Sequence, residues 1–429
     1  MHRPTKLTIV GGRRPRGQIL LIVMVAMFVM MGAAALAVDI GRLWTTKRLM
    51  QSAADAAALA GADAAASGGD ATAVNAAALA AATQNGFTDG SSSTNSTKPA
   101  SVAVTYPPTS GQYKGNSDVV QVVLSQTQPT YFLGVLGLSQ IPVSVTAAAM
   151  TISSGSCIYS LDPTAQGAVT VVGSSSVNSA CGVYVNSDNS SALVASGGGT
   201  VTAPLVGVVG GTTLNGGGST PITTKIAAFG DPLAWVPEPT VGSCSGYQPT
   251  KINSSVPPLS PGLYCGGIAL GGSANVTFSP GTYIIDGGGL SILAGAHVAG
   301  SGVTFYLTGQ NVSNSSPNAY AGVNIAGGAN VNLSAPCDSS GGGIEGMLFF
   351  QDRAMTNGTA SIINGGSTAS FSGAIYFPTT SLTYSGTSGN NGYTLLVADT
   401  LIVNGNASVG NNYSCLANGS LIKNAALVL

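Results

Sequence analysis

Near its N-terminus the chain has a run of apolar positions that no charged residue interrupts. Residues 19–38 read ILLIVMVAMFVMMGAAALAV. As a helix this run is about 30 Å long, which is the hydrocarbon thickness of a bilayer. The pattern therefore predicts a transmembrane helix over 19–38. Its Leu, Ile, Val and Phe side chains are expected to contact lipid: Ile19, Leu20, Leu21, Ile22, Val23, Val25, Phe28, Val29, Leu36 and Val38.

Basic residues flank this run and are more numerous before it. Those before it are Arg3, Lys6, Arg13, Arg14 and Arg16, and those shortly after it are Arg42, Lys47 and Arg48. Cations are retained preferentially on the cytoplasmic side of a membrane helix. We therefore expect a single-pass protein of an inner membrane. Residues 1–18 would form a basic cytoplasmic tail, and the bulk of the chain would be periplasmic or extracellular.

Three other interpretations of the apolar run stay open. A buried core helix would have to hold the whole run without a polar residue. A cleavable signal peptide has support from Ala35-Leu36-Ala37, which resembles a cleavage site, but its apolar core is usually only about 7–15 residues long. A pilin-type leader cut after Gly17 would place Ile22 where that class usually carries Glu. Retention as an anchor is the interpretation we favour.

The segment that follows, residues 39–84, is rich in alanine and contains no proline. Alanine has the highest helix propensity, so the pattern predicts a helical stalk that continues the membrane helix outward. Asp55, Asp63 and Asp70 fall on one side of such a helix and leave leucine and alanine for packing. Because an alanine face buries little apolar area, this helix requires a packing partner.

Beyond a polar linker at 84–99, alternating and Val-rich segments predict a small α/β module over 100–153. Strands are expected at 101–106, 118–125 and 141–152, with a helical turn in the apolar stretch at 131–138.

From residue 156 to 429 the pattern changes to short β-prone pieces separated by Gly, Ser and Asn. A rhythm of Gly, a polar residue and Val recurs and ends at Val177, Val276, Val298, Val331 and Val409. Periods of roughly 20–25 residues favour a right-handed parallel β-helix-like domain of about ten coils, roughly 50 Å long. A β-sandwich is the main alternative. The overall expectation is a mainly β chain with one transmembrane helix, an Ala-rich stalk and a small α/β module.

Composition and cysteine content indicate an exported protein. Charged residues are 7% of the chain, against about 25% in an average soluble domain. After residue 49 carboxylates outnumber cations, which argues against nucleic acid as a partner. The disulfide candidates are Cys157, Cys181, Cys244, Cys265, Cys337 and Cys415. Pairing of neighbours is one of fifteen connectivities, and buried free thiols are the alternative.

Many polysaccharide lyases and hydrolases are parallel β-helices, so we ask whether the carboxylates of this chain could be catalytic. Glycoside hydrolysis requires paired carboxylates. The candidates are Asp286, Glu345, Asp352 and Asp399, with Arg353 and His297 as auxiliary groups. No two carboxylates are adjacent, and His297 occupies the polar position of a repeat whose equivalents are Asn275 and Asn330. We expect structural roles for all of them, no enzyme activity, no cofactor and no metal site.

The N-terminal residues carry a recognisable combination of motifs. Arg16-Gly17-Gln18, the apolar run, Val38-Asp39-Ile40-Gly41-Arg42 and Gln51–Ala60 resemble the TadG-like proteins of the bacterial Flp (tight-adherence) pilus-assembly system, over residues 14–62. The motif residues are Gly17, Gln18, Asp39, Gly41, Arg42, Ala54, Asp55 and Ala57.

The resemblance implies a membrane-anchored, structural component of a pilus-assembly or envelope system. Its partners would be the lipid bilayer and other pilus-assembly or pilin-like subunits, contacted through the N-terminal helix. A surface adhesin or carbohydrate-binding β-helix protein, with a surface polysaccharide as partner, is the alternative, and a β-helical lyase or hydrolase is less favoured. The metal-binding adhesion motif of some relatives is not matched, because Ala192 replaces its last residue in Asp188–Ala192.

Overall fold

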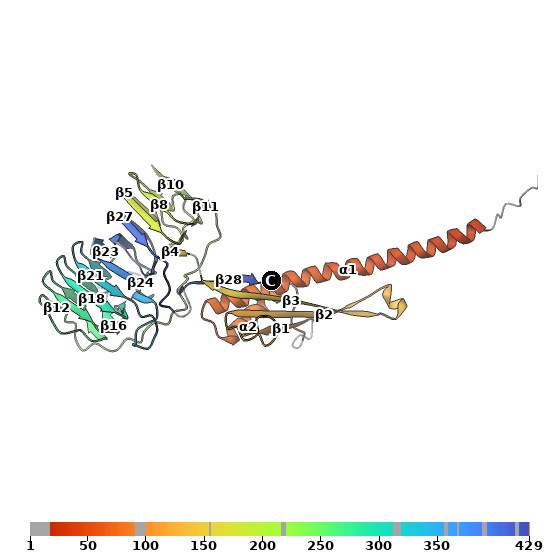
Figure 1. The fold of residues 1–429 in the computed structure, drawn as a ribbon, viewed down its shortest axis with the longest axis horizontal. Coiled ribbons are helices and arrows are strands. Elements are labelled where there is room, and N and C mark those ends of the chain that lie inside the picture. The colour runs from red at the N-terminus through yellow and green to blue at the C-terminus, as the bar shows by residue number, and fades with distance from the viewer. Residues whose placement is uncertain are drawn as a thin grey trace, which may run out of the picture. The chain divides into compact units, whose positions relative to one another are not determined.

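The computed structural model describes residues 18–90, 100–153, 156–215, 220–311, 319–355, 359–366, 369–387, 393–416 and 420–428. The chain divides into two compact units (Figure 1). The first unit comprises Met1–Ile152 and Asn424–Leu429, and the second comprises Ser153–Lys423. This division differs from the expected one, because the last residues return to the first unit. The second unit is therefore an insertion that is joined to the first by two chain connections.

The described part of the first unit contains two α-helices, α1 (Gln18–Ala66) and α2 (Ala71–Gln84). We expected one continuous stalk over 39–84, and the structure differs from this between the two helices. Gly68 adopts a positive φ, and the Asp70 carboxylate accepts a hydrogen bond from the Ala73 N–H at 2.9 Å, which caps α2. The chain thus reverses, and α2 packs against α1 to bury the alanine face.

A sheet supplies the second partner of this alanine face. Its strands are β1 (Ser101–Thr105), β2 (Val119–Pro129), β3 (Gln140–Ser153) and β28 (Lys423–Val428), in the order β1-β2-β3-β28. β2 pairs with β1 and with β3 in antiparallel register, and a short 3-10 helix, η1 (Leu133–Leu136), lies in the β2–β3 connection. The expected module is present, with β28 as an additional strand from the far end of the chain.

Gly61 permits the close approach of α1 to β2. A Cβ at this position would lie 2.9 Å from Val120 Cγ1 and 3.5 Å from Ala78 Cβ. Only a glycine lets the helix, α2 and the sheet meet here without displacement, because real Cβ atoms do not approach other atoms this closely.

The second unit consists of parallel strands stacked as successive coils (Figure 1). One sheet contains β12 (Thr250–Ile252), β14 (Ile268–Leu270), β17 (Leu290–Ile292), β20 (Val323–Ile325), β23 (Ser361–Gly366), β25 (Leu382–Thr387), β27 (Leu401–Val409), β5 (Val169–Ser179), β7 (Leu193–Ala195) and β10 (Thr212–Leu214), with β8 (Thr200–Thr202) beside β5. The other contains β13 (Gly262–Cys265), β16 (Gly281–Asp286), β19 (Val303–Thr308), β22 (Met347–Gln351), β24 (Ser370–Phe377), β26 (Thr394–Ala398), β4 (Ser156–Ser160), β6 (Gly182–Val185), β9 (Val206–Val208) and β11 (Ile222–Thr224). A shorter row of β15 (Asn275–Phe278), β18 (His297–Ser301) and β21 (Asn330–Ser334) joins β24.

Every strand pair that the structure describes in this unit is parallel, which excludes the antiparallel β-sandwich. The mainly β, β-helix-like fold class is confirmed, while its right-handed sense stays a prediction. Val276, Val298 and Val331 occupy equivalent positions in consecutive coils, as the Gly-polar-Val rhythm predicted. The other two repeats are offset, since Val409 pairs with Ser179 and Val177 with Ala407.

A ladder of buried apolar side chains runs through the coils and ends at the half-buried Leu214. Its buried members are Leu270, Ile292, Ile325, Ile363, Tyr384, Val403, Val171 and Ala195. Aromatic rings pack in the interior beside it, with Phe305 5.4 Å from Tyr283 and 5.5 Å from Phe349 between ring centroids. Each coil therefore covers the apolar surface of the next, which an isolated coil cannot do.

The coils do not follow one another in chain order. The coil formed by β26 and β27 pairs with the coil formed by β4 and β5, so residues 250–409 come before residues 156–224 in space. The chain enters in the middle of the stack, builds to one end, and then crosses to the other end through residues 225–249. We call this crossing segment the strap.

Substituting Gly61 by Leu tests the contact between α1 and β2. The added side chain must displace Val120 or the helix, so we expect a loss of about 1–3 kcal/mol in the stability of the first unit. Loss of the helical circular-dichroism signal on heating the full-length protein in detergent measures this effect.

Gly41→Leu is the matched control, because no atom lies within 4 Å of a Cβ placed at Gly41 of the same helix. It should preserve or slightly raise the melting temperature, since Gly costs about 1 kcal/mol in a helix interior. Equal melting of the two variants would contradict the close packing at Gly61.

Candidate functional site

The first half of α1 is uncovered along its whole apolar length. The large apolar side chains from Ile19 to Met31 are all more than half exposed, whereas Met50, Ala53 and Ala54 in the second half are fully buried. Among the residues that the structure describes, α1 is the helix with the length and hydropathy to cross a membrane. This contrast within one helix indicates a single-pass anchor that continues directly into a folded core.

The family-motif residue Asp39 lies at the boundary between these two halves. Its side chain is buried and accepts hydrogen bonds from the backbone N–H groups of Tyr131, Phe132 and Leu133, at 3.0, 2.8 and 2.8 Å. These N–H groups lie at the start of η1, where a helix leaves its first donors without internal partners. We call Asp39 and these three N–H groups the Asp39 clasp. The clasp fixes the tip of the β2–β3 hairpin to α1.

The electrostatics of the clasp favour an ionised carboxylate. Burial acts to raise the pKa of Asp39, but the three backbone N–H groups and the neighbouring Arg42 act against it and leave the pKa below its ordinary value. Arg42 itself lies over the ring of Tyr131, with its guanidinium carbon 4.4 Å from the ring centroid. Such a cation–π contact adds a second attachment between α1 and the hairpin tip.

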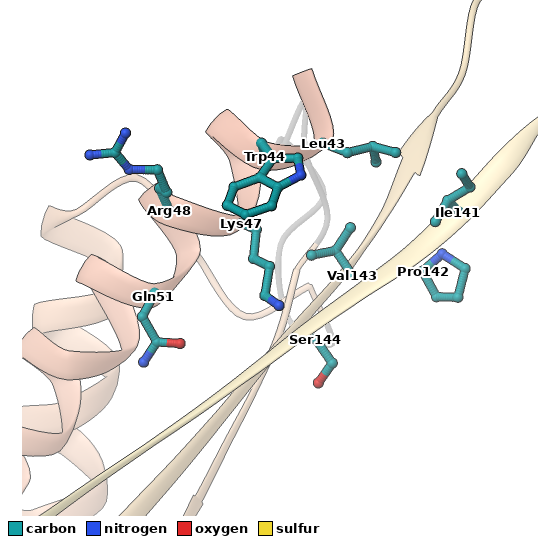
Figure 2. Close-up of a pocket in the computed structure, with 9 residues that line it drawn as sticks. All are labelled: Leu43, Trp44, Lys47, Arg48, Gln51, Ile141, Pro142, Val143 and Ser144. Carbon is teal, nitrogen blue, oxygen red and sulfur yellow. The ribbon is translucent and has the colours of Figure 1, made fainter. Parts of the chain in front are cut away.

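A groove of about 530 Å³ lies between α1 and β3, next to the clasp (Figure 2). From the helix it is lined by Leu43, Trp44, Lys47, Arg48 and Gln51, and from the strand by Ile141, Pro142, Val143 and Ser144. The groove contains no carboxylate or histidine. It therefore offers an apolar floor with two cations at its rim, which is a surface for binding rather than for catalysis.

The other motif residues have separate structural positions. Gly17 lies outside the described residues, and Gln18 is the first residue of α1. Gly41 faces open space, Ala54 and Ala57 are buried in the core, and the Asp55 carboxylate accepts a hydrogen bond from Gln51 Nε2 at 2.8 Å. The motif thus combines core packing with the clasp.

Comparison with known protein families agrees with this geometry. Residues 17–65 match the family model described as Flp pilus-assembly TadE/G-like, and residues 48–149 match the model described as Tad-like Flp pilus-assembly. The first unit is Tad-like. The resemblance to TadG-like pilus-assembly proteins is thereby confirmed, and the matched residues extend well beyond the 14–62 on which it was based. No curated protein and no solved structure matches the chain.

In contrast to the Tad-like unit, the inserted β-helix unit holds all six cysteines. They form the bonds Cys157–Cys181, Cys244–Cys265 and Cys337–Cys415, which is the pairing of neighbours along the chain. Cys244 lies in the strap and Cys265 in β13, so this bond attaches the strap to the end of the stack. Disulfides of this kind suit an exported protein.

The sequence candidates Asp352 and Arg353 directly follow β22, and both are engaged in structural contacts. Asp352 is fully buried and accepts hydrogen bonds from the Thr308 hydroxyl and from Gln310 Nε2, both at 2.7 Å. The Arg353 guanidinium donates to the carbonyl oxygens of Leu233 and Val236, at 2.7 and 3.0 Å.

A second group of contacts completes this network around Arg353. Its Nη1 lies 3.6 Å from the Glu238 carboxylate, and its Nε donates to the Tyr376 hydroxyl at 2.7 Å. That hydroxyl in turn donates to Asp231, and burial raises the pKa of Tyr376, so the phenol stays protonated. Arg353 therefore joins the strap to β24, and its charge is used in this attachment.

Asp286 secures the strap further along. It is fully buried at the end of β16 and accepts hydrogen bonds from Asn311 Nδ2 at 2.8 Å and from the Tyr247 hydroxyl at 3.4 Å. Its other oxygen has no hydrogen-bond partner among the described residues. Burial, followed by the Asp286 charge, raises the pKa of Tyr247 and keeps this phenol a donor.

The remaining candidates are dispersed. His297 is exposed and aligns with Asn275 and Asn330 in neighbouring coils, as predicted for a repeat position. Glu345 lies in the turn before β22, and Asp399 follows β26, where burial and then Asp162 raise its pKa. Within the described part of the chain, no group of three His, Cys, Asp or Glu residues has the geometry to hold a metal ion.

Sequence reasoning missed the hairpin tip as part of the site. The apolar stretch at 131–138 was visible, but its contact with Asp39 joins residues about ninety positions apart. Nothing in the local pattern around Asp39 shows where its hydrogen-bond donors come from.

Replacing Asp39 by Ala tests the clasp. The three N–H groups lose their acceptor, so we expect hydrogen exchange at the amides of 131–133 to accelerate by roughly an order of magnitude or more in the full-length protein in detergent. Asp63→Ala is the control, because Asp63 is exposed on the same helix. Since the pKa of Asp39 is lowered in the fold, the protection should persist at neutral pH and disappear only as acid protonates the folded carboxylate. Unchanged exchange in Asp39→Ala would contradict the clasp.

Replacing Arg353 by Gln tests the attachment of the strap. Two carbonyl oxygens and Glu238 lose their cationic partner, which should weaken the local fold by about 2–4 kcal/mol. Limited proteolysis should then cleave within 229–241 earlier than in the parent protein. Lys251→Gln, an exposed cation of β12, should leave the pattern unchanged. Identical cleavage in Arg353→Gln and the parent would show that the strap is held by other contacts.

Proposed function

We propose that this chain is a structural, non-catalytic component of a bacterial Flp/Tad pilus-assembly system, anchored in the inner membrane with its N-terminus in the cytoplasm. The observation that carries this proposal is the coincidence of two features. The residues that match Tad families, 17–149, form the unit in which an exposed apolar helix continues into a folded core. The cation excess before residue 19 supports the orientation.

The geometry suits a component that carries mechanical load. α1 runs without interruption from the exposed span into a core sealed by α2 and β2, so displacement of the core pulls directly on the anchor. The β-helix unit is inserted between β3 and β28, and both of its ends are therefore bonded into the Tad-like sheet. Pilus-assembly or pilin-like subunits would contact the exposed face of 19–38, where the apolar side chains are free of partners from the described chain.

An enzymatic function has little support from the described residues. Asp286, Asp352 and Arg353 bind the strap or neighbouring coils, and Asp399 lies apart from them in the sequence and on another strand end. A carbohydrate-binding adhesin also lacks a specific observation in its favour. Sugar-binding sites commonly use exposed aromatic rings, but Tyr320, Tyr384 and Tyr393 are buried in the coils. The adhesin is kept as the alternative that the experiment must separate.

Deleting the chain in its host tests the proposal. We expect loss of assembled Flp pili by electron microscopy, and restoration by the full chain. A chain in which a cleavable signal peptide replaces 1–38 should be exported but should not restore pili. Normal pili with lost surface attachment would overturn the assembly role in favour of the adhesin.

Topology has its own measurement. An epitope tag at the N-terminus should be protected from protease added to spheroplasts, whereas a tag after Leu429 should be removed. Without protease treatment, both tagged proteins should fractionate with the inner membrane. The reverse pattern of protection would contradict the proposed orientation.

A further inference from the structure

We propose that the tip of the β2–β3 hairpin, residues 130–139, inserts into the interfacial region of the same bilayer that α1 spans and forms a second membrane contact. The inference rests on the proposed function in one respect, namely that α1 stays in the membrane. It adds a lipid-binding surface that is separate from the helix.

The tip carries apolar side chains that the described part of its unit leaves largely exposed. Val135 is 86% exposed, Tyr131 63%, Leu138 55% and Phe132 48%. The sequence contains no charged residue from 119 to 161. Keeping several large apolar side chains in water at the end of a hairpin is unfavourable by about 25 cal/mol for each Å². A contiguous apolar patch of this kind marks a contact with a membrane or a protein.

The position of the tip along α1 selects the membrane. The clasp joins Tyr131, Phe132 and Leu133 to Asp39, which directly follows the predicted span. From Ile19 to Val38 the helix is about 30 Å long and fills the hydrocarbon layer. The backbone of the tip is therefore held at the level where α1 leaves that layer. Figure 1 shows the hairpin ending beside α1 part-way along its length, with the apolar end of the helix continuing past it.

The neighbours of the tip have the composition of a membrane interface. Trp44 is 68% exposed and begins about 9 Å beyond Val38, within reach of the headgroup layer. Arg42 lies over Tyr131. Lys47 and Arg48 lie on α1 one turn beyond Trp44 (Figure 2), within reach of lipid phosphates. Aromatic rings and cations gathered where a helix leaves the hydrocarbon are typical of membrane boundaries.

A second contact would restrict the tilt of the anchor. A single transmembrane helix tilts on average by about 20° and rotates about its axis. With the hairpin tip in the interface on one side of α1, rotation or tilt away from that side must pull apolar side chains into water. The Tad-like unit would thus keep a defined orientation above the membrane.

Tryptophan quenching by brominated phospholipids tests the inference on the purified full-length protein in liposomes. Trp44 and Trp235, the two native tryptophans, are replaced by Phe, and one reporter is introduced at a time. Val135→Trp reports the tip, and Phe28→Trp reports the span. Ser117→Trp reports the turn just before β2, at the end of the hairpin away from the tip and about 40 Å from it along the strand.

We expect strong quenching of Val135→Trp by bromines placed near the headgroups, strong quenching of Phe28→Trp by bromines deep in the chains, and none of Ser117→Trp. Quenching of Phe28→Trp without Val135→Trp would overturn the tip contact and leave the anchor intact. Absence of quenching for both would refute the anchor itself. Because no other protein is present, docking of the tip on a partner subunit appears as the first of these two failures.

A further variant separates insertion from proximity. With Phe132→Trp as the reporter, adding Val135→Asp should withdraw the tip and reduce the quenching several-fold, while Phe28→Trp in the same background stays quenched. Undiminished quenching of Phe132→Trp would show that the clasp merely holds the tip near lipid, and insertion would be wrong.

Discussion

The helix α1 has to be stable both in lipid and in a folded core surrounded by water. The rest of the first unit packs against the part of α1 that follows the boundary between these two environments. The apolar half of α1 leaves its side chains uncovered, while the alanine half is sealed by α2 and β2 through the contact at Gly61. Asp39 stands between them and uses its carboxylate to bind three backbone N–H groups. A charged residue at that position cannot lie in hydrocarbon, so it defines where the anchor ends and the folded core begins.

The β-helix unit uses its scarce charges in a comparable way. Only 7% of the residues in the chain are charged. The buried carboxylates of Asp286 and Asp352 accept hydrogen bonds from polar side chains at the ends of the coils, and the half-buried Arg353 donates to backbone carbonyl oxygens of the strap. Buried polar groups are costly unless they are paired, which explains why these residues coincide with the strap rather than with an open cleft. These charged residues therefore lie where the irregular strap is attached to the regular stack of coils.

The features that could be predicted from the sequence are those that depend on the local pattern of residues. The apolar run, the alanine helix, the strands of the small module and the alignment of Val276, Val298 and Val331 all follow from periodicity or propensity. The sequence could not predict contacts chosen by tertiary structure. The chain reversal at Gly68 had a visible signal in two adjacent glycines, but β28 looks like any short β-prone piece, and the partners of Asp39 are remote in the sequence. The order of the coils was also hidden, because every coil presents a similar surface for stacking.

That order has a physical reason in the return of β28 to the first sheet. A stack built in simple chain order would place its last coil at the opposite end from its first, about 40 Å away at 4.8 Å per coil. The chain would then need a long, unsupported segment to bring β28 back. Entering in the middle avoids this, because β4 pairs with β26 and β5 with β27, so entry and exit lie on adjacent coils. The long crossing becomes the strap instead, which the stack itself supports through Arg353, Asp286 and the Cys244–Cys265 bond.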